Sequence, residues 1–167
     1  MNAIRIDITS TIAAAQKNLV GAEPWPIDYS DKQDLKNNQL PSSLRTNPIN
    51  IYALWKREAG EAWQLMYIGE RKFESGWSRI EQHLFSTPKS TQSKLLEVKA
   101  VIESGAEIGI TAILVEPDSM RLTIEEELIK RNSMSAEHLI WNRKGRAKLP
   151  KVGIRPNADL HVGPRGY

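Results

Sequence analysis

The chain contains no cysteine. This excludes disulfide frameworks, thiolate zinc sites and cysteine nucleophiles, and it is compatible with a reducing compartment, so we expect a cytoplasmic protein. The sequence also lacks any run approaching the roughly 20 apolar residues that a membrane span requires, so we expect no association with a membrane. The N-terminal residues show no basic region followed by an apolar block, and no signal peptide is expected.

The composition is that of an ordinary soluble globular protein. Of the 167 residues, 40% are hydrophobic and 26% are charged, and the sequence contains no internal repeat. A chain of this length buries one core, so we expect a single domain of catalytic size with an appended arm. We divide the chain into an N-terminal arm (1–47), a central domain (48–144) and a C-terminal tail (145–167).

The charge is distributed unevenly along the chain. Residues 1–47 carry five basic and five acidic side chains, whereas residues 48–140 carry eleven basic and fourteen acidic ones. Residues 141–167 carry seven basic side chains against one carboxylate. A basic C-terminal segment favours a polyanionic partner, of which nucleic acid is the commonest, and a solubilising tail is the alternative. The candidate nucleic-acid contacts are Arg143, Lys144, Arg146, Lys148 and Lys151.

Hydrophobic periodicity and turn residues predict an α+β fold. A short helix is expected over residues 7–20, followed by a proline-rich connecting segment over 21–47. Strands at 49–56 and 62–69 should form a β-hairpin, because a four-residue loop joins them. The later elements are expected at 75–85 (helix), 91–104 (helix), 107–115 (strand) and 117 to about 132 (helix). The result is a small three-stranded sheet with an N-terminal β-hairpin, flanked by helices, plus an N-terminal helical arm.

The hairpin brings two tyrosines together. A symmetric turn about Ala59 and Gly60 places Tyr52 directly opposite Tyr67. Cross-strand partners point to the same face with Cβ atoms roughly 4.5–5.5 Å apart, so both phenols should converge on one spot. The alternative is a stacked aromatic pair that only stabilises the hairpin, and a bulge in either strand would change the register.

A glutamate in the last predicted helix lies on the wrong face for a solvated side chain. Leu122, Ile124, Leu128 and Ile129 define an apolar arc at 100° per residue, and Glu125 falls inside it. A carboxylate on the core side is costly unless it is paired or binds a cation. Glu125 is therefore a candidate ligand for Mg²⁺, which needs few protein ligands. The alternative is a glutamate at the rim that reaches solvent or pairs with a basic residue of its own helix, Arg121 or Lys130.

Arg79 and His83 are spaced at i and i+4 on the helix after the hairpin and share one face. The planar guanidinium of an arginine is suited to a phosphate during transfer, and a histidine could orient or deprotonate a water. The alternative is an exposed arginine beside a histidine satisfied at the edge of the core.

Together these features resemble the GIY-YIG nuclease superfamily, closest in style to its restriction and homing endonucleases. The two signature motifs read here as Asn50-Ile51-Tyr52 and Tyr67-Ile68-Gly69. The arginine helix of the family matches Arg79-Ile80-Glu81-Gln82-His83, its metal-binding helix matches residues 125–130, and its closing asparagine matches Trp141-Asn142. Asn50 replaces the glycine of the first motif, which we expect to alter strand packing rather than chemistry.

The resemblance implies an endonuclease that hydrolyses DNA phosphodiester bonds with one divalent ion, Mg²⁺ or Mn²⁺, per active site. In that mechanism Glu125 holds the metal, and Tyr52 acts near the attacking water as a general base or an orienting group. Tyr67 belongs to the same cluster, and Arg79 stabilises the transition state.

Three further residues receive supporting roles from the same resemblance. His83 would support the water or the phosphate, and Asn142 would brace the site by structural hydrogen bonds. Lys72 is the nearest match to a lysine that some members carry after the second motif. The partner implied is nucleic acid, with double-stranded DNA favoured, and the enzyme could act as a homodimer.

Two other interpretations are open at this point. The main rival is a catalytically inactive nucleic-acid-binding or regulatory module on the same fold, which would bind nucleic acid without cleaving it. The other is an interaction protein whose N-terminal arm mediates assembly. The fold alone does not decide between them.

Overall fold

A four-stranded antiparallel sheet forms the centre of the protein. The computed structural model describes residues 3–89 and 91–145. The strands are arranged in the order β1-β4-β2-β3, and they are β1 (Trp25–Pro26), β2 (Ile51–Arg57), β3 (Gln64–Glu70) and β4 (Glu107–Ile113). The α+β class expected from the sequence is confirmed.

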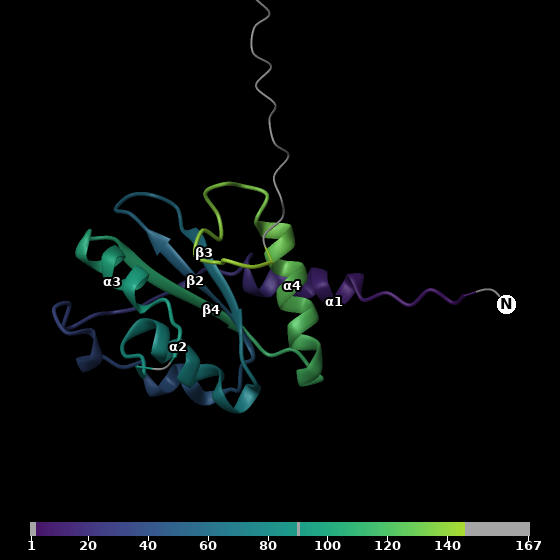
Figure 1. Cartoon of the computed structure of the whole chain (residues 1–167), viewed down its shortest axis with the longest axis horizontal. Helices are drawn as coiled ribbons and strands as arrows, with labels where there is room; N and C mark the ends of the chain where they lie inside the picture. The colour runs from purple at the N-terminus through teal and green to yellow at the C-terminus, as the bar shows by residue number, and fades with distance from the viewer. Residues whose placement is uncertain (1–2, 90, 146–167) are drawn as a thin grey trace, which may run out of the picture.

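Helices cover both faces of this sheet. The helices are α1 (Thr9–Leu19), α2 (Gly76–Leu84), α3 (Leu95–Glu103) and α4 (Arg121–Asn132), and short 3₁₀ turns lie at Leu35–Asn37, Ser42–Thr46, Phe73–Ser75 and Asp118–Met120. Figure 1 shows α2 and α3 on one side of the strands and α1 and α4 on the other. Within the described ranges, every helix is too short or too polar to cross a bilayer.

The central strand β2 is buried on both faces because helices cover each side. Tyr52 and Leu54 pack into the core cluster beneath α2 and α3. Ile51, Ala53 and Trp55 alternate with them and pack into the cluster beneath α1 and α4. A strand covered in this way has no solvent-facing side, and its sequence is apolar along its length rather than alternating.

The predicted helices and the hairpin agree with the structure to within four residues at each end. Helix α4 begins at Arg121 rather than at residue 117, since the 3₁₀ turn Asp118–Met120 precedes it. Helix α3 begins at Leu95, whereas the sequence places its start near residue 91. The backbone groups just before α3 are used by α2 instead: the Lys94 N–H donates to His83, and the Gln92 carbonyl accepts from Arg79. These non-local bonds hold the segment as a loop.

The prediction of three strands was wrong, because residues 21–47 also contribute one. Trp25 and Pro26 pair with Ile110 and Gly109 of β4, and the Ile27 N–H donates to the Ile108 carbonyl. A two-residue strand containing proline shows no alternation that a sequence pattern could detect. Proline is tolerated there because β1 lies at the edge of the sheet.

The predicted register of the hairpin was also wrong. Tyr52 lies opposite Gly69, and Tyr67 lies opposite Leu54. Beside the turn, Lys56 already pairs with Gln64, one residue later than a symmetric turn predicts. An extra residue of β3 opposite Leu54 and Trp55 adds a second shift. The two tyrosines are therefore diagonal neighbours on one face rather than direct partners.

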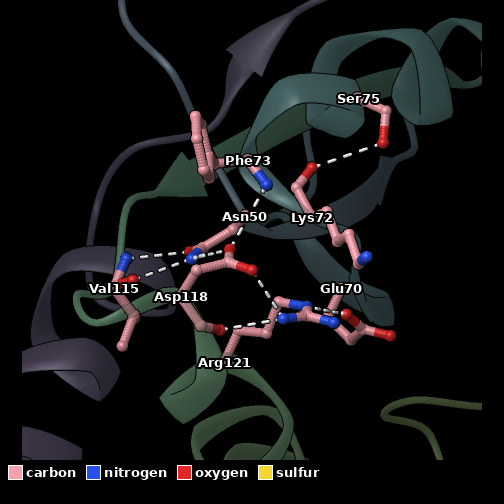
Figure 2. Close-up of polar contacts among 8 residues, drawn as sticks. All are labelled: Asn50, Glu70, Lys72, Phe73, Ser75, Val115, Asp118 and Arg121. Carbon is pink, nitrogen blue, oxygen red and sulfur yellow. Dashed lines mark hydrogen bonds and ion pairs between the residues drawn. The ribbon is translucent and has the colours of Figure 1, made fainter.

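Asn50 connects three parts of the chain at the start of β2 (Figure 2). Its side-chain nitrogen donates to the Val115 carbonyl at 2.7 Å and to Asp118 at 2.9 Å, and its oxygen accepts from the Val115 N–H at 2.8 Å. The residue is fully buried. The expectation that Asn50 acts on strand packing agrees with these contacts, which tie β2 to the junction between β4 and α4.

Replacing Asn50 should destabilise this junction. We expect Asn50→Ala to lower the free energy of unfolding by roughly 2 to 4 kcal/mol, because the backbone N–H and carbonyl of Val115 lose their buried partner. Urea unfolding would measure the loss. The matched control is Asn18→Ala on the exposed surface of α1, for which we expect a change within about 0.5 kcal/mol. Equal losses from the two variants would contradict this account of Asn50.

Candidate active site

One cavity gathers most of the residues singled out from the sequence. It has a volume of about 600 Å³, and Tyr67, Arg79, His83, Glu125 and Asn142 are among its lining residues. A cavity of equal size beside β1 has a single ionisable lining residue, an aspartate. Ionisable side chains in a shared concavity are what a reaction site requires, so the first cavity is the candidate active site.

The two phenols pack together over a glycine. The rings of Tyr52 and Tyr67 have centroids 6.3 Å apart. A Cβ atom on Gly69 would lie 2.6 Å from Cε1 of Tyr67 and 2.7 Å from Oη of Tyr52. Any larger residue would collide with both rings. The glycine of the second motif is therefore needed for close approach, and the convergence of the phenols survives the change of register.

His83 fixes the orientation of Tyr52. The imidazole is fully buried, its Nδ1 accepts from the Lys94 N–H at 2.9 Å, and its Nε2 lies 2.8 Å from the Tyr52 hydroxyl. Burial, together with the smaller effect of the nearby charges of Arg79 and Lys94, lowers the pKa of His83 to about 3. The ring is therefore neutral, with its proton on Nε2, and it donates to the Tyr52 oxygen.

This geometry limits what His83 and Tyr52 can do. Both nitrogens of His83 are occupied, so the ring has no free lone pair with which to deprotonate a water. Tyr52 is 1% exposed, and it lies behind Tyr67 and His83 rather than in the cavity wall. Burial, followed by the neighbouring phenol of Tyr67, raises the pKa of Tyr52 well above its ordinary value. Tyr67 is the phenol that reaches the cavity.

Arg79 enters the cavity from α2. Its guanidinium donates to the side chain of Gln82 at 2.8 Å and to the backbone carbonyl of Gln92. Both partners are neutral, so they orient the guanidinium without cancelling its charge. The positive charge of Arg79 opposes the effect of burial on the pKa of both tyrosines. Arg79 is thus an oriented cation within reach of the phenols.

Glu125 enters the same cavity from α4 and has no hydrogen bond or ion pair among the described residues. The two basic residues of α4 that the sequence offers as its partners are engaged elsewhere. Arg121 binds Glu70 and Asp118, each at 2.6 Å, while Lys130 pairs with the two acidic residues that follow Glu125. The interpretation of Glu125 as a paired rim residue is therefore not supported.

The charge on Glu125 is unfavourable in this environment. Burial, together with the smaller effect of the nearby carboxylates of Glu70 and Glu126, raises its pKa to about 7. Arg121 holds Glu70 in place at the end of β3 (Figure 2). A divalent cation would offset this cost, because its positive charge would compensate the negative charge of the Glu125 carboxylate. The donor set of one carboxylate with open space beside it fits Mg²⁺, which retains most of its waters.

Asn142 closes the unpaired edge of β3. Its side-chain amide donates to the Ile68 carbonyl at 2.8 Å and accepts from the Ile68 N–H at 2.9 Å. The N–H groups of Leu139 and Trp141 donate to the carbonyls of Leu65 and Met66. These contacts agree with the bracing role expected for Asn142, since they fasten the chain after α4 to the strand that carries Tyr67.

The remaining predicted residues are placed differently. Lys72 is exposed on the turn after β3 and is not among the residues that line the cavity. Arg143 and Lys144 are exposed and line its rim. The other proposed nucleic-acid contacts, Arg146, Lys148 and Lys151, lie outside the described residues.

The prediction that four apolar residues of α4 face the core was correct only in part. Ile124, Leu128 and Ile129 are buried, but Leu122 is 52% exposed beside the cavity. Sequence reasoning also missed Glu70 and Lys94, which the fold brings to the site from the end of β3 and the loop before α3. The adjacency of Glu70 to Gly69 is the one local signal that could have indicated its position.

Comparison with models of protein families, with curated proteins and with solved structures finds no match for this chain. In the part of the chain that the structure describes, no three His, Cys, Asp or Glu side chains are grouped to hold a metal ion. A Mg²⁺ site does not require such a group, since one or two carboxylates are sufficient. The functional argument therefore depends on the geometry of the cavity.

The raised pKa of Glu125 predicts a pH-dependent cost to stability. A carboxyl group whose pKa is raised in the folded state stabilises the fold at low pH, and this contribution is lost as pH rises from its ordinary value through about 7. We therefore expect Glu125→Gln, without divalent metal, to be more stable than the wild type by about 1 kcal/mol at about pH 8, where partial solvent exposure moderates the effect.

At about pH 4.5 the two proteins should unfold at nearly the same temperature, because Glu125 is then protonated in the folded state. Thermal unfolding in EDTA at both pH values would measure the difference. Glu127→Gln on the same helix is the control, since that carboxylate pairs with Lys130. A stability difference that is the same at both pH values would contradict the predicted environment of Glu125.

Proposed function

We propose that this protein is a metal-dependent endonuclease of the GIY-YIG type that hydrolyses phosphodiester bonds of double-stranded DNA. The observation that carries the proposal is the half-buried carboxylate of Glu125, which shares one cavity with Arg79 and Tyr67 and has no cation paired with it. The order of the motifs along the chain supports the same conclusion. An oriented guanidinium, a phenol and an unpaired carboxylate are the groups that phosphoryl transfer to water uses.

Glu125 would hold one divalent cation, Mg²⁺ or Mn²⁺. When bound, such an ion supplies positive charge that neutralises the scissile phosphate and its leaving oxygen. Glu125 must lose its proton to bind the cation, and its raised pKa means that this competition falls near neutral pH. Affinity for the metal should therefore weaken as pH falls below about 7.

Arg79 would bind the nonbridging oxygens of the scissile phosphate. Its planar fork is already oriented by Gln82 and Gln92, so little conformational freedom is lost when the substrate arrives. Its charge can follow the negative charge that spreads over the equatorial oxygens in the transition state. In this arrangement Glu125 binds the metal ion and Arg79 binds the phosphate.

The phenols would orient the attacking water. Tyr67 faces the cavity. Tyr52 lies behind Tyr67, and its oxygen accepts a hydrogen bond from His83. Because burial raises the pKa of both phenols, each keeps its proton at neutral pH. We therefore assign the phenols to hydrogen bonding rather than to removal of a proton, with His83 and Tyr52 positioning Tyr67 from behind.

Double-stranded DNA is the proposed substrate because of the basic residues at the rim. Arg143 and Lys144 line the cavity mouth just after Asn142, and the following segment of the sequence is also basic. Contacts of lysine and arginine with phosphates give affinity that does not depend on sequence and falls with salt. The rim would thus hold the duplex while the cavity receives one phosphate.

The direct test is cleavage by the purified protein. We expect it to cut plasmid DNA in Mg²⁺ or Mn²⁺, with less activity on single-stranded DNA, branched DNA and RNA, and to be inactive in EDTA. Glu125→Gln should lower the rate by about a hundredfold or more, because the metal loses its ligand. Gel electrophoresis would measure the products.

Glu127→Gln is the matched control for this test, and it should cleave at the wild-type rate because Glu127 is paired with Lys130 outside the cavity. Binding of DNA without cleavage in either metal would favour the inactive module instead. Wild-type activity in Glu125→Gln would refute the ligand assignment while leaving the nuclease proposal in place.

The two phenols should differ in a way that tests their arrangement. We expect Tyr67→Phe to lower kcat by about a hundredfold with little change in DNA affinity, because the hydroxyl proposed to orient the attacking water is lost. Tyr52→Phe should lower kcat and also stability, by about 1 to 3 kcal/mol, since the buried His83 Nε2–H loses its acceptor.

Tyr29→Phe is the control for Tyr52→Phe. Tyr29 is also buried and also has one hydroxyl bond, to the Leu84 carbonyl, but it does not line the cavity. It should retain full kcat. If Tyr67→Phe kept wild-type turnover while Tyr52→Phe lost it, the order of the two phenols proposed here would be reversed.

A further inference from the structure

A lysine that the sequence analysis did not select lies in the cavity wall. Lys94 immediately precedes α3, and its Nζ lies 5.3 Å from the centroid of the Tyr67 ring. Its side chain is only 13% exposed, and the residue lines the cavity together with Arg79 and Glu125. A lysine side chain that is mostly covered beside a candidate phosphate site needs an explanation, because withdrawing a charge from water is costly unless it is compensated.

The compensation for Lys94 within the described residues is weak. Its ion pair with Glu97 joins Nζ and Oε1 at 3.7 Å, a long separation for such a pair. Pairs at this spacing on a helix contribute little. The aromatic face of Tyr67 adds a modest attraction. Arg79 is in the same situation, because its partners are the neutral groups of Gln82 and Gln92.

Within the described residues, the cavity wall therefore carries one cation with no ion pair, Arg79, and one with only a long ion pair, Lys94. Both come from neighbouring segments, α2 and the loop before α3, which are bonded to each other through His83 and Gln92. Glu125 enters from α4, a different element. An anion between these segments would meet both positive charges, whereas a cation would be directed to Glu125.

We propose that Lys94 is a substrate-binding residue whose Nζ donates to a phosphate oxygen of the nucleic-acid backbone, next to the phosphate held by Arg79. This inference rests on the proposed function and extends it to a specific contact. The ammonium nitrogen of Lys94 lies over the ring of Tyr67 and near Glu97, so it is held in place before the substrate binds. Such pre-organisation reduces the entropy lost on binding.

Lys94 replaces Lys72 in this role. Lys72 is exposed on the turn after β3, and its charge acts on Asp118 rather than on the cavity. The resemblance that selected Lys72 depended on distance along the chain after the second motif. The cavity instead receives Lys94 from the loop that follows α2.

Binding of DNA without catalysis would test the contact. We would measure the affinity of a short fluorescein-labelled duplex in EDTA by fluorescence anisotropy over a range of NaCl concentrations. Lys94→Met keeps an unbranched side chain and the backbone bond to His83. It should bind about fivefold more weakly, with a log–log salt slope smaller by about 1. Lys94→Arg should restore both the affinity and the slope, because it keeps the charge.

Lys99→Met is the matched control. Lys99 lies on α3, is half exposed and pairs with Glu103 away from the cavity, so both its affinity and its salt slope should equal those of the wild type. Thermal unfolding would establish that the variants are folded, and Lys94→Gln would serve in place of Lys94→Met if the latter were unfolded. A purely structural role for Lys94 would not change the salt slope.

Two outcomes would overturn the inference, and they can be told apart. If the wild type binds and cleaves DNA while Lys94→Met and Lys99→Met behave alike, the lysine contact is wrong and the nuclease proposal stands. If the wild type neither binds nor cleaves nucleic acid in any metal, the proposed function fails and the contact fails with it. Weaker binding and a reduced slope in Lys94→Met alone would support the contact.

Discussion

The buried imidazole of His83 is the interaction on which the arrangement of the cavity depends. One ring nitrogen accepts from the backbone of the loop before α3, and the other donates to Tyr52 of β2. The ring itself belongs to α2, so three segments meet at one neutral side chain. Because a backbone N–H can only donate, the tautomer is fixed, and the direction of the bond to Tyr52 follows from it. The hydrogen-bonding pattern behind the cavity is thus set by the fold rather than by pH near neutrality.

Much of the architecture could be predicted because it is encoded locally. Helices α1, α2 and α4 have apolar residues at helical spacing, and the hairpin has two apolar runs around a short turn. The parts that were missed depend on distant partners. β1 contains two residues and forms only because β4 offers its edge, and α3 starts late because α2 takes the polar groups before it. No pattern in a short window carries that information.

The candidate site divides in the same way. Glu125 could be selected from helical phase, and the phenols could be brought together from the hairpin. The partner of Tyr52 is nevertheless shifted by two residues, one from an offset at the turn and one from the bulge. Strand alternation explains this tolerance, since a shift of two keeps a side chain on its original face. Lys94 and Glu70 could not be selected, because their positions follow from the packing of α3 and α4 against the sheet. Only the structure shows that Tyr52 is buried while Tyr67 lines the cavity.

The contacts of Asn142 have a consequence for association between chains. β3 is the outer strand of the sheet, and an exposed strand edge offers backbone groups that another chain can pair with. The asparagine amide and the segment around Trp141 occupy those groups from Leu65 to Ile68. The segment that borders the cavity therefore also acts as a shield against strand addition. A chain that ended before Asn142 would lose part of the cavity lining, and it would also expose the outer backbone edge of β3 to pairing with another chain.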